Sequence, residues 1–263
     1  SESDLDMALE MLSKSKVDVI YLVDSYGSIY PEQIRRFMDK YLKIAEGCDK
    51  HCTYCVIPKV RGSFRSFPIE YLVNQTKKLV EGGVKEIILV AQETTLYGVD
   101  LYGKKSLPKL LHNLGLIEGL EWIRILYCYP EEINDELIEA IKNEPKVCHY
   151  LDMPIQHASD NILKRMGRRT SKQELTDIVA KLRREIPDIA LRTTLITGFP
   201  GETDVDHEEV MQFIDECEFD RLGIFTYSRE EDTVAAQMPD QIDEEIKGKY
   251  SCLLYTSDAA DEL

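Results

Sequence analysis

Three cysteines stand close together in the stretch EGCDKHCTYCVIP, and their types and spacing are the strongest chemical signal in the chain. Cys48, Cys52 and Cys55 follow the pattern C-x3-C-x2-C. Iron–sulfur clusters are held by cysteine thiolates, usually four of them. Three protein ligands would leave one iron of a four-iron cluster open for a substrate or cofactor, and Lys50 and Lys59 would help to hold the thiolates. We therefore predict that this loop binds one [4Fe-4S] cluster.

Three other interpretations of the loop stay open on the residues alone. Cys52 and Cys55 form C-x-x-C, as in thioredoxin-like redox sites, although that motif is expected to open a helix in a smaller domain. A zinc site needs a fourth ligand, and His51 lies between the cysteines, where it points poorly for tetrahedral closure. Inert buried thiols are the third alternative. A loop rich in lysine and aspartate disfavours it.

Alternating strand and helix patterns surround this loop and must position it. The predicted strands are 41–47, 85–92, 122–129, 150–156, 189–198 and 220–228. The predicted helices are 68–83, 106–117, 134–143, 160–169, 171–187 and 203–218, with an Asn cap at the third and a Thr cap at the last. Parallel strands with right-handed crossovers form a doubly wound sheet or a barrel, and the loops after the strands form the functional face. The cysteine loop follows the first strand and so belongs to that face.

Composition and charge limit the classes of function. Hydrophobic residues make up 43% of the 263 residues, which is enough for a sizeable core. The net charge is −16, and residues 204–245 hold 15 acidic residues but only two basic ones, Arg221 and Arg229. This balance disfavours a nucleic-acid backbone as partner and suits a basic protein or a solvated surface. No apolar run approaches the roughly 18 residues of a membrane span, and the acidic start does not resemble a signal peptide, so we expect a cytoplasmic protein.

The cysteine spacing, with Tyr54 just before the third cysteine, resembles that of the radical S-adenosylmethionine (SAM) superfamily. The stretches AQETTLYGVDLYG, YLDMPIQHAS, RTTLITGFPGET and GIFTYSREEDTVAA together resemble the methylthiotransferases. They are most similar to the RimO branch, which modifies an aspartate of a small-subunit ribosomal protein. The resemblance covers residues 41–249. It implies a partial (βα)6 TIM-like barrel, a [4Fe-4S] cluster with three cysteine ligands, and cleavage of SAM to a 5'-deoxyadenosyl radical.

The resemblance also implies positions that contact SAM. The residues that we predict to bind this cofactor are Tyr54, Gln92, Glu93, Gln156, Arg192, Gly198 and Gly201. The polar pair that ends the second strand is expected at the amino end of SAM, the arginine in the fifth strand at its carboxylate, and the two glycines near the adenine. Each assignment has a structural alternative. The polar pair could cap a loop, the arginine could pair with another residue of the chain, and the glycines could form an ordinary strand-to-helix turn.

Other residues with chemical potential are given structural roles. His157 follows Gln156, and a lone histidine is more often structural than catalytic. The basic group Lys164, Arg165, Arg168 and Arg169 is interpreted as a solvated helix face. The scattered Cys128, Cys148 and Cys217 are expected to be core thiols.

The two ends of the chain depart from the family pattern. Residues 1–40 resemble a βα segment of a pyruvate-type aldolase, and residues 250–263 resemble translated adaptor and are expected to be unstructured. Family members carry three further cysteines in an N-terminal domain and a small C-terminal β-barrel, whereas no cysteine precedes Cys48 here. We therefore expect a chimeric or truncated gene product that binds one cluster and SAM but does not complete methylthiolation unaided.

The expected partners are a basic ribosomal protein as substrate and an electron donor such as flavodoxin or ferredoxin, with no membrane and no nucleic acid. Two alternative functions stay open. One is a tRNA methylthiotransferase of the related branch, which shares the core. The other is a non-catalytic iron–sulfur fragment.

Overall fold

A parallel sheet of six strands forms the centre of the fold. In the computed structural model, which describes residues 41–260, its strands are β1 (Tyr41–Lys43), β4 (Glu86–Val90), β5 (Trp122–Ile125), β6 (Val147–Asp152), β7 (Ala190–Thr197) and β8 (Arg221–Thr226). Their order in space is their order in the chain, and each pair of neighbours is parallel. Sequential parallel strands joined by helices build a barrel, here an open one, so the predicted α/β partial barrel is confirmed.

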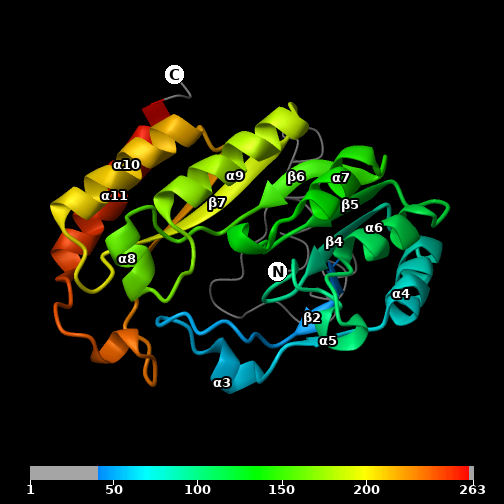
Figure 1. Cartoon of the computed structure of the whole chain (residues 1–263), viewed down its shortest axis with the longest axis horizontal. Helices are drawn as coiled ribbons and strands as arrows, with labels where there is room; N and C mark the ends of the chain where they lie inside the picture. The colour runs from blue at the N-terminus through cyan, green and yellow to red at the C-terminus, as the bar shows by residue number, and fades with distance from the viewer. Residues whose placement is uncertain (1–40, 261–263) are drawn as a thin grey trace, which may run out of the picture. The chain divides into compact units, whose positions relative to one another are not determined.

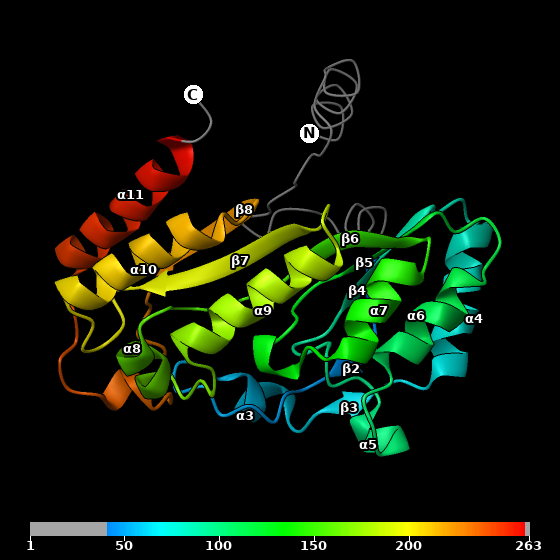
Figure 2. The ribbon, with the colours of Figure 1, turned by 45° about the horizontal axis from the view of Figure 1, so that its top comes forward.

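Helices connect the strands and cover one side of the sheet (Figures 1 and 2). The longer helices are α4 (Ile69–Glu81), α6 (Leu107–Gly115), α7 (Asp135–Asn143), α9 (Lys172–Glu185), α10 (Asp204–Cys217) and α11 (Glu244–Ala260). Shorter ones are α3 (Ile57–Arg61), α5 (Val99–Tyr102), α8 (Asp160–Arg165) and the 3-10 turns η1 (Pro130–Glu132) and η2 (Ala235–Gln237). A two-stranded antiparallel sheet of β2 (Ala45–Glu46) and β3 (Arg65–Ser66) lies beside the main sheet.

The core forms between the sheet and the helices because strand side chains alternate. Along β7 every second residue is buried, beginning with Leu191, and the residues between them are partly exposed toward the barrel interior. Helix α6 meets this layer with four fully buried leucines at helical spacing, Leu107, Leu110, Leu111 and Leu114. Apolar side chains therefore dominate the layer between the sheet and the helices, and the partly exposed side of β7 presents Arg192, Thr194 and Ile196.

The helix starts follow the capping chemistry that the sequence predicts. The Asn134 side chain accepts a hydrogen bond of 3.0 Å from the Leu137 N–H. Thr203 forms a capping box with Asp206 at the start of α10. Both predicted caps are confirmed.

Three elements differ from the prediction. The first predicted strand divides after Lys43, because β1 pairs with β4 while Ala45 and Glu46 pair with β3 in a separate two-stranded sheet. Helix α3 follows the cysteines without a predicted counterpart. The segment from residue 250 continues α11 to Ala260 instead of being unstructured, since Tyr250 stacks on His207 with ring centroids 4.2 Å apart and Leu254 is fully buried. The predicted aldolase-like segment 1–40 lies outside the described residues.

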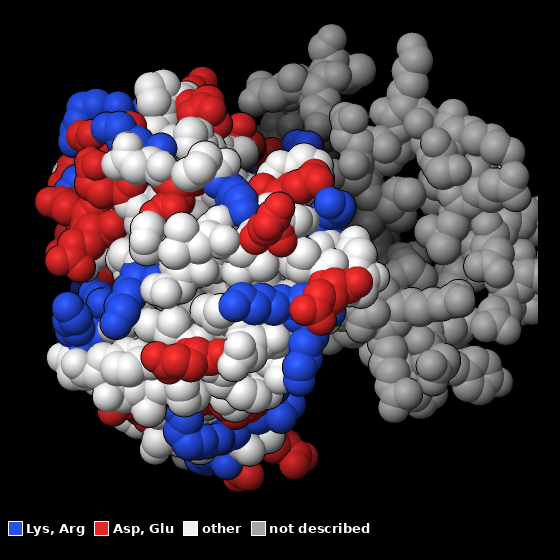
Figure 3. Space-filling model, turned by 90° about the vertical axis from the view of Figure 1, so that its right-hand side faces the viewer, with Lys and Arg blue, Asp and Glu red and all other residues white. Residues whose placement is uncertain are grey.

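Charged side chains are distributed without a dominant sign on the face that carries α4. Figure 3 shows lysine and arginine interspersed with aspartate and glutamate there. None of the helices in the described part of the chain is long and apolar enough to cross a membrane.

Gly47, directly before the first cysteine of the loop, tests how tightly the fold fixes this segment. Its φ is +80°, and a Cβ there would lie 2.3 Å from the Ser63 carbonyl oxygen. We expect Gly47→Ala to lower the free energy of unfolding by about 3 kcal/mol, from backbone strain and overpacking together. Gly83→Ala is the matched control, because its φ is +97° but nothing lies within 4 Å. It should cost only about 1 kcal/mol. Equal losses in urea denaturation would show that sterics at Gly47 are unimportant.

Candidate functional site

The cysteine loop is fixed by the residue at its centre, Thr53. The Thr53 N–H donates to the Met166 carbonyl at 2.9 Å, and its hydroxyl donates to the Arg165 carbonyl at 2.8 Å. The Thr53 carbonyl accepts from the Ala235 N–H at 2.8 Å. The loop after the first strand is therefore tied to the end of α8, which follows the inner strand β6, and to η2, which follows β8 at the opposite edge of the sheet.

The three thiols lie together in this loop but are not arranged around a single ion. Cys48 and Cys52 are buried and Cys55 is partly buried. Among residues 41–260, no group of three or more His, Cys, Asp or Glu side chains is placed to hold one metal ion. The loop offers three soft sulfur donors, which is the donor set that iron–sulfur clusters use.

Burial disfavours the thiolate form of two of these cysteines. It raises the pKa of Cys48 to about 11, against a hydrogen bond from the Lys50 N–H that lowers it, and burial likewise raises the pKa of Cys55. The Tyr129 hydroxyl lies 3.5 Å from the Cys52 sulfur. Metal binding requires thiolates, so loading of the loop releases protons.

A cavity of about 360 Å³ opens beside the cysteines. Its lining residues are Lys43, Cys48, Cys55, Ile57, Val90, Ala91, Gln92, Tyr127 and Tyr129. Two of the thiols therefore face the same space as Gln92, whose side-chain oxygen accepts a hydrogen bond of 2.8 Å from the Gly47 N–H. The cavity mouth lies at the carboxyl ends of β1 and β4, where the sequence places it.

Glu93 lies next to this cavity and is fully buried. Burial raises the pKa of its carboxyl to about 7, although Thr95 and Lys50 oppose the shift. One carboxyl oxygen accepts hydrogen bonds from the Thr95 N–H and hydroxyl, and the other has no partner within the described residues. An orphaned buried oxygen needs a donor, and the protonated amino group of a ligand would fit that need.

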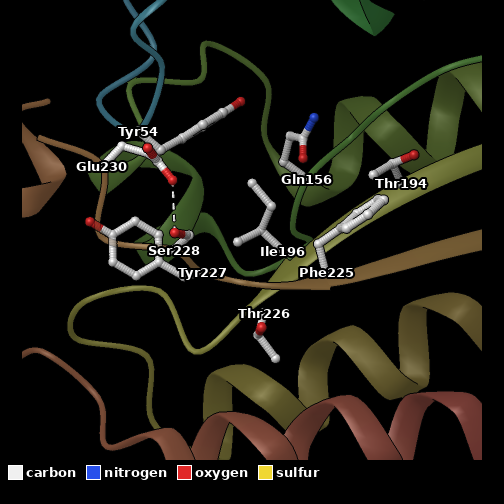
Figure 4. A pocket seen from close by; sticks show the side chains of 9 residues that line it. All are labelled: Tyr54, Gln156, Thr194, Ile196, Phe225, Thr226, Tyr227, Ser228 and Glu230. Atoms are coloured by element: carbon white, nitrogen blue, oxygen red, sulfur yellow. Dashed lines mark hydrogen bonds between the residues drawn. The ribbon is translucent and has the colours of Figure 1, made fainter. Parts of the chain in front are cut away.

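A second cavity of about 240 Å³ lies at the ends of β7 and β8 (Figure 4). Its lining residues are Tyr54, Gln156, Thr194, Ile196, Phe225, Thr226, Tyr227, Ser228 and Glu230. Ile196 lies in the middle, between Tyr227 on one side and Phe225 on the other, and Ser228 donates a hydrogen bond of 2.7 Å to Glu230. Aromatic and branched walls with polar groups at the edge suit a flat heteroaromatic ring. Tyr54 joins this cavity to the cysteine loop.

The other predicted SAM contacts have partners within the chain. Arg192 pairs with Asp152 at 2.7 Å, so the charge inside the fifth strand has its counterion. Gly198 and Gly201 are not among the lining residues of either cavity. A Cβ on Gly198 would lie 2.2 Å from the Lys247 side chain, and one on Gly201 would lie 2.5 Å from Arg165. Their glycine requirement is therefore explained by packing of the turn.

Arg168 departs from the expectation of a solvated basic helix face. Its side chain is buried, with 7% exposure, and it lies 4.2 Å over the Tyr129 ring. It donates a hydrogen bond of 3.0 Å to the Pro154 carbonyl. The burial of Arg168 could not be predicted from its charge, because Lys164 and Arg169 of the same basic group are exposed. The prediction is wrong for Arg168 because the chain turns inward at Gly167, where φ is +74°.

A buried cluster of three ionisable residues supports the turn after β7. The Glu202 carboxyl lies 3.5 Å from His157 Nε2 and 3.4 Å from His207 Nδ1, and its other oxygen accepts a 3.0 Å hydrogen bond from the Phe199 N–H. His157 is thus structural, as the sequence suggested. Its partners come from α10 and the preceding turn, which no local pattern reveals.

The sequence profile of the radical SAM superfamily matches residues 42–214. The chain belongs to the radical SAM superfamily. Within it, a ribosomal protein uS12 methylthiotransferase RimO from Lachnoclostridium phytofermentans is 69% identical over 79% of this chain, and one from Geobacter sulfurreducens is 59% identical over the same share. The resemblance to the RimO branch is confirmed for this core. The alignments cover 47% and 46% of those relatives, so the chain spans about half the length of the curated relatives it matches.

Solved structures share the fold with this chain at low sequence identity. The radical SAM methyltransferase TsrM from Kitasatospora setae, solved with cobalamin and a [4Fe-4S] cluster, superposes with a TM-score of 0.59 at 16% identity, over 71% of this chain and 36% of that one. Methylornithine synthase PylB gives 0.58 at 11% identity, over 82% and 61%. These similarities support the partial barrel.

The Glu202 cluster predicts a pH dependence of stability. Burial alone would raise the pKa of Glu202, but contacts with His157 and His207 outweigh it and lower the pKa from 4.5 to about 2. A depressed carboxyl pKa stabilises the fold above the unfolded value, and the contribution fades as pH falls from about 5 toward 2. Wild type should exceed Glu202→Gln by about 3 kcal/mol at pH 7 and keep less than half of that margin at pH 3 in urea titrations. The exposed Glu216→Gln should show no such margin, and a margin that is constant with pH would contradict the assignment.

Proposed function

We propose that this chain is the radical SAM core of a methylthiotransferase that acts on an aspartate of ribosomal protein uS12. The observation that carries the proposal is the placement of Cys48, Cys52 and Cys55. They lie in one braced loop at the carboxyl ends of a parallel partial barrel, beside a cavity that two of them line. A [4Fe-4S] cluster and SAM, when bound, supply reductive cleavage of the sulfonium to a 5'-deoxyadenosyl radical.

The chain's own residues hold and orient these groups. The three cysteines are the cluster ligands. Gln92 borders the cavity beside them, and the orphaned oxygen of Glu93 suits the amino group of SAM. The buried walls of the site exclude water, which strengthens each of these polar contacts.

The second cavity accepts the adenosine end of the same cofactor. Tyr54 and the apolar side chains around it provide a stacking surface, and Gln156 provides a polar edge. Arg192 is proposed as a carboxylate partner, and Gly198 and Gly201 as the turn that supports the adenine side. Because Tyr54 lies between two cluster ligands in sequence, the two cavities are coupled through the loop.

The substrate and electron donor follow from the relatives' names and the chemistry. The curated relatives are named as uS12 methylthiotransferases, and an acidic chain with a net charge of −16 suits a basic ribosomal protein. Reductive cleavage requires a one-electron donor such as a flavodoxin or ferredoxin.

Loss of the three thiols should remove the metal and leave the fold. In anaerobically reconstituted protein we expect the triple variant Cys48→Ala, Cys52→Ala and Cys55→Ala to lose its iron, its sulfide and the EPR signal of the reduced cluster. Wild type and Cys217→Ala, which removes a buried thiol of α10, should retain all three. Wild type should also form 5'-deoxyadenosine from SAM in the presence of a reductant. Iron-free wild type, or zinc in the loop, would refute the proposal.

Removal of the Tyr54 ring should weaken SAM binding without removing the cluster. Loss of one stacked aromatic ring is expected to raise the Kd for SAM by about tenfold or more. Tyr71→Ala is the control, because Tyr71 is an exposed tyrosine on α4. Equilibrium dialysis against labelled SAM, with iron content measured in the same samples, gives the comparison. An unchanged Kd would place the adenine elsewhere.

A further inference from the structure

Arg168 is a buried cation that has no carboxylate partner in the described part of the chain. Its side chain is 7% exposed, and no ion pair of residues 41–260 involves it. Nη2 donates to the Pro154 carbonyl at 3.0 Å, whereas the buried Nε has no hydrogen-bond partner among these residues. Burial of a charge is costly unless an opposite charge offsets the cost. The described residues therefore leave this guanidinium without the anion that it needs.

Two carboxylates near the cysteine loop are already paired with lysines. Glu131 lines a small crevice together with Arg168, but it pairs with Lys50 at 3.4 Å. Lys50 also pairs with Glu132 at 2.5 Å, and Glu132 pairs with Lys105 at 2.7 Å. Two lysines balance two glutamates in this network, so its net charge is zero without Arg168. The positive charge of Arg168 is therefore in excess at this part of the site.

One of the three thiols of the loop lies beside this excess charge. Cys52 and Arg168 line the same crevice, which has a volume of about 40 Å³. Cys48 and Cys55 line the larger cavity proposed for SAM, and Cys52 is not among its lining residues. Tyr129 lines both spaces. Cys52 is thus the proposed cluster ligand on the Arg168 side of the loop.

Tyr129 connects the guanidinium to this thiol. Arg168 lies 4.2 Å over the centre of the Tyr129 ring, and the Tyr129 hydroxyl lies 3.5 Å from the Cys52 sulfur. The backbone of Tyr129 is fixed as well, because its N–H donates to Thr95 Oγ1 at 3.3 Å. A thiolate has no hydrogen to donate, so the hydroxyl is the donor once Cys52 is a metal ligand.

We propose that Arg168 and the Tyr129 hydroxyl supply the counter-charge of the bound cluster on its Cys52 side and make the cluster easier to reduce. This role rests on the proposed function. Thiolate ligands give the cluster a net negative charge, and the electron from a one-electron donor makes that charge more negative by one. A buried cation and a hydrogen bond to a ligand sulfur both favour the more negative state, so they raise the reduction potential. Both side chains are positioning residues, because they act through Cys52.

The test is a reductive titration of the anaerobically reconstituted chain in the absence of SAM. Titanium(III) citrate supplies the electron, and EPR measures the fraction of reduced cluster at each potential. Arg168→Met removes the charge and keeps an unbranched side chain. At the wild-type midpoint potential its ratio of reduced to oxidised cluster should be lower by about tenfold or more, which is a shift of about 59 mV for a one-electron couple. Tyr129→Phe, which keeps the ring beside Arg168, should shift the midpoint in the same direction.

Two further variants separate the charge of Arg168 from its packing and from general electrostatics. Arg168→Lys keeps a cation and should retain most of the wild-type midpoint. Arg169→Gln removes the adjacent cation, whose side chain is exposed, and solvent and salt screen a charge in that position. Its midpoint should equal that of wild type. Thermal unfolding, iron and sulfide are measured for every protein, because a purely structural role of Arg168 would lower stability and leave the midpoint unchanged.

The outcomes divide clearly between support and refutation. An unchanged midpoint in folded, iron-loaded Arg168→Met would overturn the role of the arginine, and the same result in Tyr129→Phe would overturn that of the hydroxyl. If folded Arg168→Met does not keep its iron, retention by Arg168→Lys supports the counter-charge and loss from both contradicts it. Tyr129→Phe leaves the contacts of Arg168 in place, so it decides the matter if the Arg168 variants do not fold. Failure of the proposed function is distinguishable, because wild type itself would then bind no [4Fe-4S] cluster or would not cleave SAM.

Discussion

The three hydrogen bonds of Thr53 are the interaction on which the site depends. They join the loop after β1, at one edge of the sheet, to segments that follow β6 and β8. An open barrel has no closing strand to fix the distance between its edges. The loop spans that gap with backbone contacts, and it carries the cysteines and Tyr54 between the two cavities as it does so. The geometry of the cofactor site therefore depends on the contacts that this loop makes across the open side of the barrel.

The charged side chains inside the barrel serve ligand binding more than they stabilise the fold. The pairs Glu86–Arg124, at 2.8 Å, and Asp152–Arg192, at 2.7 Å, both face the inside, and Arg124 also lies 4.8 Å over the Tyr150 ring. Of these four side chains only that of Asp152 is fully buried, and partly exposed ion pairs contribute little net stability. Charged side chains there present oriented polar groups to a polar ligand. The stability of the fold comes from the other face of the sheet, where the leucines of α6 pack.

Periodic patterns made the strands, the longer helices and their caps predictable, because each depends on residues close in sequence. The three cysteines were equally local. Elements of two to five residues, such as β2, β3 and α3, carry too little pattern to be seen. The burial of Arg168 and the contacts of Glu202 depend on residues many positions away. Helix α11 was missed because the buried side chains described for it, Lys247, Tyr250 and Leu254, include only two that are apolar or aromatic, which give little amphipathic signal. The predicted roles of Gly198 and Gly201 were shaped by family resemblance, whereas their surroundings are set by Lys247 and Arg165.

The bracing of the cysteine loop has a consequence for the life of the cofactor. In many small metalloproteins the ion organises the chain, so the free energy of metal binding is the free energy of folding. Here the loop's backbone is tied to the barrel by groups that do not ligate metal. A chain that has lost its iron to oxygen thus keeps a ready template, and repair becomes a matter of supplying iron, sulfide and electrons instead of refolding a polypeptide.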